Sequence, residues 1–241
     1  MMGSKNNDRW SIFIDVEGFS FLHKTSEFEA HRRLNNLIED IYKIGTQIYP
    51  DDPDRLFVHQ LGDGFVIVSS FAEETLYRPL SIALALMQSA LLKGGICKAG
   101  ISDGNFADVQ GTWPKEIRDN IESSATLRIG EGVMKLFTVM GDALINSYKA
   151  LSLSGSGPHL VIDNRIKCLM PPDIRIMKES EHLLFTNWLN LNTSLSNDIL
   201  EILGHENINH KEIYNQFEVY IQENKASEEW KANANKYLEN G

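Results

Sequence analysis

The chain has 241 residues, of which 42% are hydrophobic and 23% charged, so it can bury a substantial core. Lys and Arg total 23 against 33 Asp and Glu, and the formal net charge of −10 argues against a protein that grips a nucleic-acid backbone. Two isolated cysteines, Cys97 and Cys168, exclude a disulfide framework and a cysteine zinc site. The longest apolar run, 82–87, is too short to span a bilayer, and the polar N-terminus lacks a secretory signal. These features predict a cytoplasmic protein that binds neither nucleic acid nor membrane.

The hydrophobic pattern predicts alternating strands and helices from residue 10 onward. A capping box at Ser26 and Glu29 begins the first helix, and Gly94-Gly95 ends the second. Turns are expected at 62–64 and 103–104, and the segment 112–132 is expected to be irregular or partly helical. The predicted strands are 10–16, 56–61, 65–69, 96–102, 133–140 and 160–162, and the predicted helices are 26–50, 80–91 and 142–153.

The order of these elements is β-α-β-β-α-β, followed by further β-α-β elements. This order is typical of an α+β fold with a ferredoxin-like split βαβ sheet and helices on one face. Three segments are expected: a disordered N-terminus at 1–9, a main domain at 10–165 and a partly helical C-terminal appendage with added strand or helix elements at 166–241. The appendage follows a change to polar, Asn-rich sequence.

Two acidic residues stand where predicted strands end. Asp15 is delivered by the first strand, and Asp63 lies in the Gly62-Asp63-Gly64 hairpin. In a split βαβ sheet the first strand and this hairpin are neighbours, so the two carboxylates can converge. Two such carboxylates suit hard divalent cations such as Mg²⁺ or Mn²⁺, and the amides around 18–20 could hold phosphate oxygens. The structural alternative is that Gly-Asp-Gly is simply a turn.

At this point the sequence resembles the class III nucleotide cyclases. Phe13-Ile-Asp-Val-Glu-Gly-Phe-Ser20 looks like the motif that opens their catalytic domain, and Leu61-Gly-Asp-Gly64 looks like their second metal-binding hairpin. Lys98-Ala-Gly-Ile101 is similar to the following Arg-x-Gly-Ile strand, and Met140-Gly-Asp-Ala143 to the Trp-Gly-x-x segment before the last catalytic helix. The matches fall in the family's order. The segment 10–165 is thereby identified as a nucleotide cyclase catalytic domain.

The resemblance implies a lyase that makes a 3′,5′-cyclic mononucleotide and pyrophosphate from a nucleoside triphosphate. It also implies a head-to-tail homodimer with active sites at the interface. On this mapping Asp15, Asp63 and the backbone carbonyl of Val16 bind two divalent metal ions, Mn²⁺ or Mg²⁺. Gly18, Phe19 and Ser20 hold the triphosphate.

The departures from the family pattern concern substrate and catalysis. The two base-reading positions carry His59 and Thr138, which fit neither the adenine nor the guanine pattern. Lys149 stands where the family has its transition-state Arg. It can offset charge there only as a point charge, and the alternative is that it is an exposed lysine on the helix. The catalytic Asn position falls on Ile145, and Asn146 replaces it if the helix register shifts by one.

The segment from Phe106 to Pro114 looks like the bacterial pyrimidine cyclases of Pycsar antiphage defence. This subclass implies conversion of UTP, or less favourably CTP, to a cyclic mononucleotide sensed by a separate effector protein. The alternatives are an adenylate or guanylate cyclase with atypical base readers, and a catalytically silent nucleotide-binding dimerisation module. The seven histidines show no His-x-x-x-His spacing, so no zinc site is predicted, and His31 is interpreted as part of a solvated helix face.

Overall fold

The computed structural model describes residues 8–49, 56–70, 74–122, 125–224 and 226–239. Its elements are β1 (Asp8–Val16), α1 (Phe19–Thr25), α2 (Glu27–Lys43), η2 (Ile44–Ile48), β2 (Phe57–Leu61), β3 (Gly64–Ser70), α3 (Tyr77–Leu92), β4 (Cys97–Asn105), β5 (Ala107–Asp108), η3 (Gln110–Thr112), α4 (Lys115–Asn120), β6 (Thr126–Ile129), β7 (Gly132–Lys135), β8 (Val139–Met140), α5 (Asp142–Leu153), β9 (Leu160–Asp163), η5 (Asn164–Leu169), β10 (Ile176–Glu179), β11 (Leu183–Thr186), α6 (Ser194–Ile202), α7 (His210–Glu223) and α8 (Glu228–Glu239).

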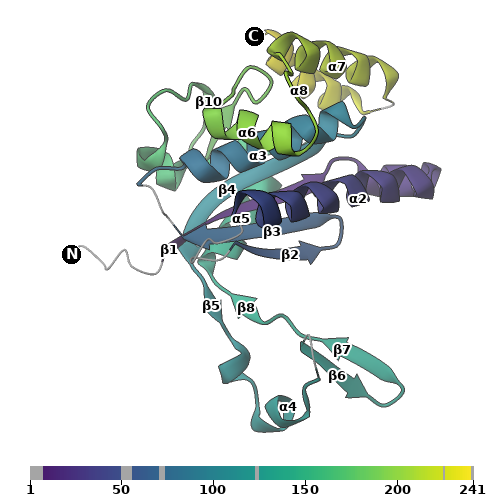
Figure 1. The fold of residues 1–241 in the computed structure, drawn as a ribbon, viewed down its shortest axis with the longest axis vertical. Helices are drawn as coiled ribbons and strands as arrows, with labels where there is room; N and C mark the ends of the chain where they lie inside the picture. Colours follow the sequence, from purple (N-terminus) through teal and green to yellow (C-terminus); the bar gives the residue numbers. More distant parts are fainter. Residues whose placement is uncertain (1–7, 50–55, 71–73, 123–124, 225, 240–241) are drawn as a thin grey trace.

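A mixed seven-stranded sheet organises the molecule, and the α+β prediction is confirmed. The strand order is β10-β11-β9-β4-β1-β3-β2 (Figure 1). Every neighbouring pair is antiparallel except β4 and β9, which are parallel. The expected β-α-β-β-α-β succession is present from β1 through α2, β2, β3 and α3 to β4.

Strand β1 lies inside the sheet and is buried on both faces. Trp10, Ile12 and Ile14 belong to the main core, which α2 and α3 cover. Phe13 points to the other face and packs with Leu151 of α5. The expectation of helices on one face is therefore wrong, since α5 covers the second face. Because both faces are covered, the strand reads as a nearly continuous apolar run.

The segment after residue 165 is part of the same core. Strands β10 and β11 extend the sheet beyond β9, and Trp188 is completely buried in the main hydrophobic cluster. The Gln88 amide of α3 donates hydrogen bonds to the carbonyls of Trp188 and Leu191, at 2.9 and 3.1 Å. The expected appendage is therefore continuous with the sheet and core of the 10–165 segment.

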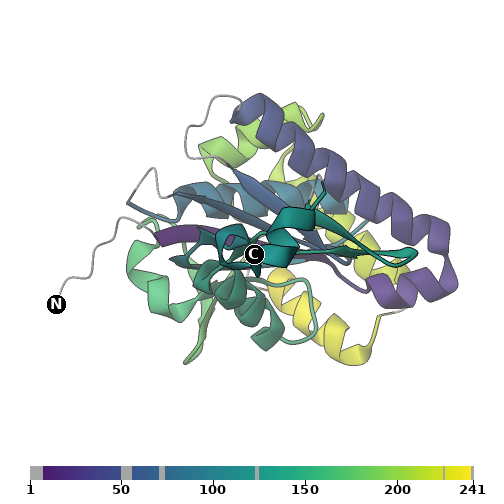
Figure 2. The same cartoon turned by 90° about the horizontal axis from the view of Figure 1, so that it is seen from below.

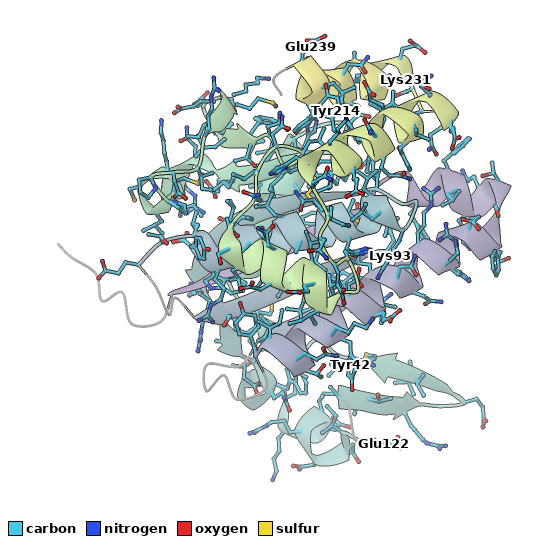
Figure 3. The ribbon with its side chains drawn as sticks, turned by 45° about the horizontal axis from the view of Figure 1, so that its top comes forward. Tyr42, Lys93, Glu122, Tyr214, Lys231 and Glu239 are labelled. Atoms are coloured by element: carbon cyan, nitrogen blue, oxygen red, sulfur yellow. The ribbon has the colours of Figure 1, made fainter. Side chains whose placement is uncertain are left out.

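Residues 107–140 form an arm that projects from the sheet (Figure 1). The short pair β5–β8 leads into it, and α4 and the β6–β7 hairpin lie at its far part. Figure 2 views the molecule from this end, and Figure 3 shows Glu122 of the arm opposite Tyr214 and Lys231 of the C-terminal helices.

Two local predictions are corrected by the structure. The segment 112–132 contains strand β6 as well as helix, because Gly130 takes a left-handed φ of 64° and turns the chain into β7. The predicted turn at 103–104 is instead part of β4. A Cβ at Gly104 would lie 2.6 Å from the backbone nitrogen of Ala143, so this glycine permits close packing of α5.

The chain ends differ in what the structure describes. The expected disorder at 1–9 falls mostly on residues outside the described ranges, but Asp8 and Arg9 already belong to β1 and pair with β4. Among the described residues, no helix combines the length and the hydropathy required to cross a membrane.

Candidate functional site

Asp15 and Asp63 meet at one edge of the sheet. Asp15 is the penultimate residue of β1, and its cross-strand partners are Gly64 on β3 and Lys98 on β4. Asp63 immediately precedes β3, in the turn between β2 and β3. Asp63 is adjacent in sequence to Gly64, the cross-strand partner of Asp15, and its charge acts on the Asp15 carboxyl group. Residues 48 positions apart in the sequence are thus brought together by strand pairing.

The hairpin glycines explain how Asp63 reaches this place. Gly62 has a φ of 67°, a left-handed conformation that glycine adopts without a steric penalty. A Cβ on Gly64 would lie 2.9 Å from the ring of Phe13, so the start of β3 approaches β1 too closely for a larger residue. The Gly-Asp-Gly sequence therefore forms a turn and also seats Asp63 against β1.

Three acidic side chains, Asp15, Glu17 and Asp63, dominate the electrostatics at this end of the sheet. The pKa of Asp15 is raised to about 7, chiefly by burial and next by the charge of Asp63, whereas Lys98 acts in the opposite direction. The Lys98 ammonium lies 3.0 Å from Glu17 Oε2 and 4.0 Å from Asp15 Oδ2. Without a cation, two adjacent carboxylates are easiest to accommodate when they share a proton.

This donor set fits a hard divalent cation. The side-chain donors of Asp15 and Asp63 are all carboxylate oxygens, which Mg²⁺ and Mn²⁺ prefer. A cation would relieve the repulsion that raises the pKa of Asp15. Val16, whose backbone carbonyl is the predicted third ligand, is the buried last residue of β1, directly beside Asp15.

The predicted phosphate-holding residues lie at the start of a short helix, α1. Gly18 has a φ of 74° and precedes α1, and its carbonyl accepts a hydrogen bond from Leu22 N at 3.0 Å. Phe19 and Ser20 are the first two residues of α1. Their backbone amides have no partner inside the helix, as at any helix start.

The two predicted base-reading residues line one cavity. His59 of β2 and Thr138 of the arm border a space of about 410 Å³, together with Lys135 of β7. The imidazole of His59 packs edge-on against the ring of Phe137, with centroids 3.9 Å apart. Burial, and then the charge of Lys135, lower the pKa of His59 and favour its neutral form. His59 and Thr138 are distant in the sequence, and they border one cavity because this part of the arm lies next to β2.

The predicted catalytic residues of α5 lie away from the carboxylate pair within one chain. The Asn146 amide donates to the carbonyl of Asp103 at 3.0 Å, and Asp103 pairs with Trp10 near the opposite end of β1 from Asp15. Trp10 lies five positions before Asp15 along the strand, a distance of about 17 Å. Lys149 is exposed, and it lines a cavity of about 220 Å³ together with Asn146. The structure therefore places Asn146 away from Asp15 in the same chain, and it places Lys149 beside a cavity that Asp15 does not line.

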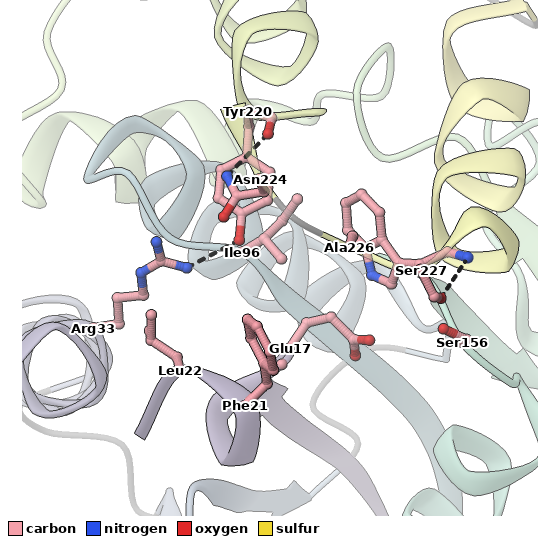
Figure 4. Close-up of a pocket in the computed structure, with 12 residues that line it drawn as sticks. Glu17, Phe21, Leu22, Arg33, Ile96, Ser156, Tyr220, Asn224, Ala226 and Ser227 are labelled. Carbon is pink, nitrogen blue, oxygen red and sulfur yellow. Dashed lines mark hydrogen bonds between the residues drawn. The ribbon is translucent and has the colours of Figure 1, made fainter. Parts of the chain in front are cut away.

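A larger cavity, which was not predicted from the sequence, lies beside the carboxylate edge, the end of the sheet that carries Asp15 and Asp63. It has a volume of about 530 Å³ and is bordered by Glu17, Arg33 and residues of the α7–α8 connection (Figure 4). Arg33 donates a hydrogen bond to the Tyr220 hydroxyl at 2.9 Å. The partners are 187 positions apart, so no local sequence signal could have revealed this contact. Through its ion pair with Lys98, Glu17 connects the cavity wall to the carboxylate edge.

Comparisons with known proteins do not supply a function for this arrangement. No family model matches the chain, and no curated protein matches its sequence. Function must therefore be inferred from the positions and chemistry of the side chains themselves.

Proposed function

We propose that this protein is a nucleotide cyclase that converts a pyrimidine nucleoside triphosphate, with UTP as the first candidate and CTP as the second, to its 3′,5′-cyclic mononucleotide. The ribose 3′-hydroxyl attacks the α-phosphorus, a new ester bond forms, and the bond to the leaving pyrophosphate breaks, while the hydroxyl proton passes to a solvent or substrate oxygen. The observation that carries the proposal is the convergence of Asp15 and Asp63 at the end of β1, where Asp15 pairs with Gly64, the residue that follows Asp63. The β4-β1-β3-β2 strand order is consistent with the ferredoxin-like cyclase core implied by the sequence resemblance.

Each residue at the carboxylate edge has a defined task in this proposal. Asp15, Asp63 and the Val16 carbonyl hold two divalent cations, and Gly18, Phe19 and Ser20 contact the triphosphate. When bound, Mn²⁺ or Mg²⁺ would lower the pKa of the ribose 3′-hydroxyl and would offset the negative charge of the triphosphate. Lys98 balances the acidic groups and orients Glu17, to which it is ion-paired.

The separation of the remaining site residues supports a shared, dimeric active site. Asn146 lies toward the opposite end of β1 from Asp15, and Lys149 faces a cavity that Asp15 does not line, so a second copy arranged head to tail could supply both residues. The α5 surface next to them presents Tyr148, which is 58% exposed, and Ile145, which is 57% exposed. Large exposed apolar side chains at such a position favour a protein interface. Lys149 would then offset negative charge on the phosphoryl group of the partner's substrate.

The cavity shared by His59 and Thr138 supports a small base. A neutral imidazole can donate one hydrogen bond and accept another, and the Thr138 hydroxyl can do the same. A pocket that pairs its polar groups with one base discriminates strongly against a base that leaves them unpaired. Following the resemblance to the Pycsar cyclases, the product would act as an antiphage second messenger read by a separate effector protein.

The test is incubation of the purified protein with each of the four ribonucleoside triphosphates and Mn²⁺, with products read by mass spectrometry. We expect cyclic UMP, or cyclic CMP, together with pyrophosphate. The Asp63→Asn variant should lose turnover, whereas the matched control Asp173→Asn, at an exposed turn position, should keep it. Cyclic AMP or cyclic GMP would refute the pyrimidine assignment. A folded, dimeric protein that forms no product would refute catalysis and leave the silent nucleotide-binding module.

The shared-site arrangement has its own test. Neither Asp63→Asn nor Lys149→Ala homodimers should be active, because each lacks one half of every site. After the two variants are mixed through unfolding and refolding, each heterodimer contains one intact site, so activity should return. Full activity of Lys149→Ala alone would refute the assigned role of Lys149, and failure of mixing to restore activity would refute sharing between chains.

A further inference from the structure

Three metal-ligating side chains come together at the junction of α1 and α2. His23 lies in the last turn of α1, Glu27 is the first residue of α2, and His31 follows Glu27 by four positions. All three are exposed, and their ligand atoms lie within 4.8 Å of one another. The imidazole centroids of His23 and His31 are 5.6 Å apart. The sequence spacing alone hides this cluster, because the bend between the helices brings His23 over the face that carries His31.

The backbone at this junction is held in place. The Ser26 amide donates to the Leu22 carbonyl at 2.7 Å, and the Thr25 hydroxyl contacts the carbonyls of Phe21 and Leu22 at 3.1 Å. The Ser26 side chain also caps α2 by accepting from Glu29 N at 3.4 Å. These contacts fix the angle between the helices without using any of the three ligand side chains. The backbone positions of the three ligand residues are therefore set before a cation arrives.

We propose that His23, Glu27 and His31 form a binding site for Zn²⁺ or a cation of similar ligand preference. Two imidazole nitrogens and one carboxylate are a ligand set found at zinc sites with one position left open to water. Ligands at about 2.0–2.2 Å from Zn²⁺ lie within about 3.6 Å of one another, so the side chains need to close by about 1 Å. Exposed side chains make this movement by rotation of their χ angles.

The site differs in chemistry from the Asp15 and Asp63 pair. Nitrogen ligands select Zn²⁺, Co²⁺ or Ni²⁺ over Mg²⁺, whereas paired carboxylates accept hard cations. The inference does not depend on the proposed cyclase activity, because it rests on ligand type and position alone. A cation bound here would tie α1 to α2 and thereby hold the segment that begins with Phe19 and Ser20.

The test is a titration of the whole protein with Co²⁺ and then Zn²⁺ in the presence of excess Mg²⁺. Mg²⁺ occupies the oxygen-only positions, and the visible absorption of Co²⁺ reports nitrogen ligation. We expect one bound Co²⁺ per chain that Zn²⁺ displaces. His23→Ala and His31→Ala should weaken binding by at least about tenfold, because even residues that only support a ligand cost about 10–100-fold when lost. The matched control is His182→Ala, an exposed histidine outside the cluster, which should bind as the parent protein does.

A second measurement separates a site from scattered surface binding. Zn²⁺ should slow amide hydrogen exchange in α1 of the parent protein and of His182→Ala, and should leave exchange in His31→Ala unchanged. Equal Co²⁺ affinity in the parent protein and both cluster variants would overturn the proposal. Absence of a Co²⁺ absorption band in the parent protein would overturn it as well.

Discussion

His159 should make the fold sensitive to acid, and the size of the effect follows from its surroundings. The side chain is buried at the start of β9. Its Nε2 donates to the Ser156 carbonyl at 3.1 Å, because a carbonyl can only accept, and its Nδ1 accepts from the Tyr237 hydroxyl at 2.8 Å. The neutral imidazole thus satisfies both neighbours. Burial lowers the pKa of His159 to about 4, mainly by penalising the charged form.

The sign of the pH dependence follows directly. The pKa of a histidine in the unfolded chain is about 6.5, so the unfolded state takes up a proton first as the pH falls. Stability contributed by His159 is complete above that pH, decreases below it and is fully lost below about pH 4. Between pH 8 and pH 5 the loss is about 2 kcal/mol of unfolding free energy, and the total is about 3 kcal/mol.

The assay is urea unfolding of the parent protein and His159→Gln at pH 8 and pH 5. Glutamine can still donate and accept but has no charge to gain, so the variant should lose about 2 kcal/mol less than the parent protein over this range. His182→Gln removes an exposed histidine and should follow the parent protein. An equal pH dependence in the parent protein and His159→Gln would refute the reasoning.

Two further predictions concern the carboxylate edge and the packing of α5. In metal-free protein, Asp63→Asn should lower the pKa of Asp15 below about 7, because a neighbouring negative charge is removed while burial remains. Carbon-13 titration of the carboxyl groups measures this pKa. An unchanged pKa of Asp15 in the variant would show that Asp63 does not act on it. Gly100→Ala should destabilise the protein by about 1–3 kcal/mol, since its Cβ would lie 2.7 Å from the Ser147 carbonyl oxygen of α5. Gly111→Ala, with open space around it, is the control in the same urea measurement, and equal stabilities would contradict the packing argument.

Local signals allowed much of the fold to be predicted. Helix α5 occupies the expected 142–153, framed by glycines, and Ser26 caps α2 as its capping-box sequence indicates. The hairpin at 62–64 also forms where expected, and the pairing of β3 with β1 then places Asp63 near Asp15. In these cases the residues that specify the element lie inside or beside it.

Other features depend on contacts that local patterns do not encode. Added strand or helix elements were expected after residue 165, but the positions of β10 and β11 were not predicted, because such short strands carry little periodicity. Their existence depends on the pairing of β11 with β9 and of β10 with β11. The turn expected at 103–104 reflects a glycine needed by α5, a neighbour almost forty residues away. The roles proposed for His59, Thr138, Asn146 and Lys149 also depend on placement, within the arm or in a second copy, that spacing along one chain does not reveal.

The inner position of β1 has a consequence for how the chain acquires its structure. Ile12 pairs with Ile67 on one side and with Ile101 on the other. The second pairing spans about 90 positions, and contacts of such long range slow folding. During synthesis an apolar strand would leave the ribosome well before either partner exists, and unpaired strands of this kind are prone to aggregate. We therefore expect β1 to need protection from aggregation until β4 has left the ribosome.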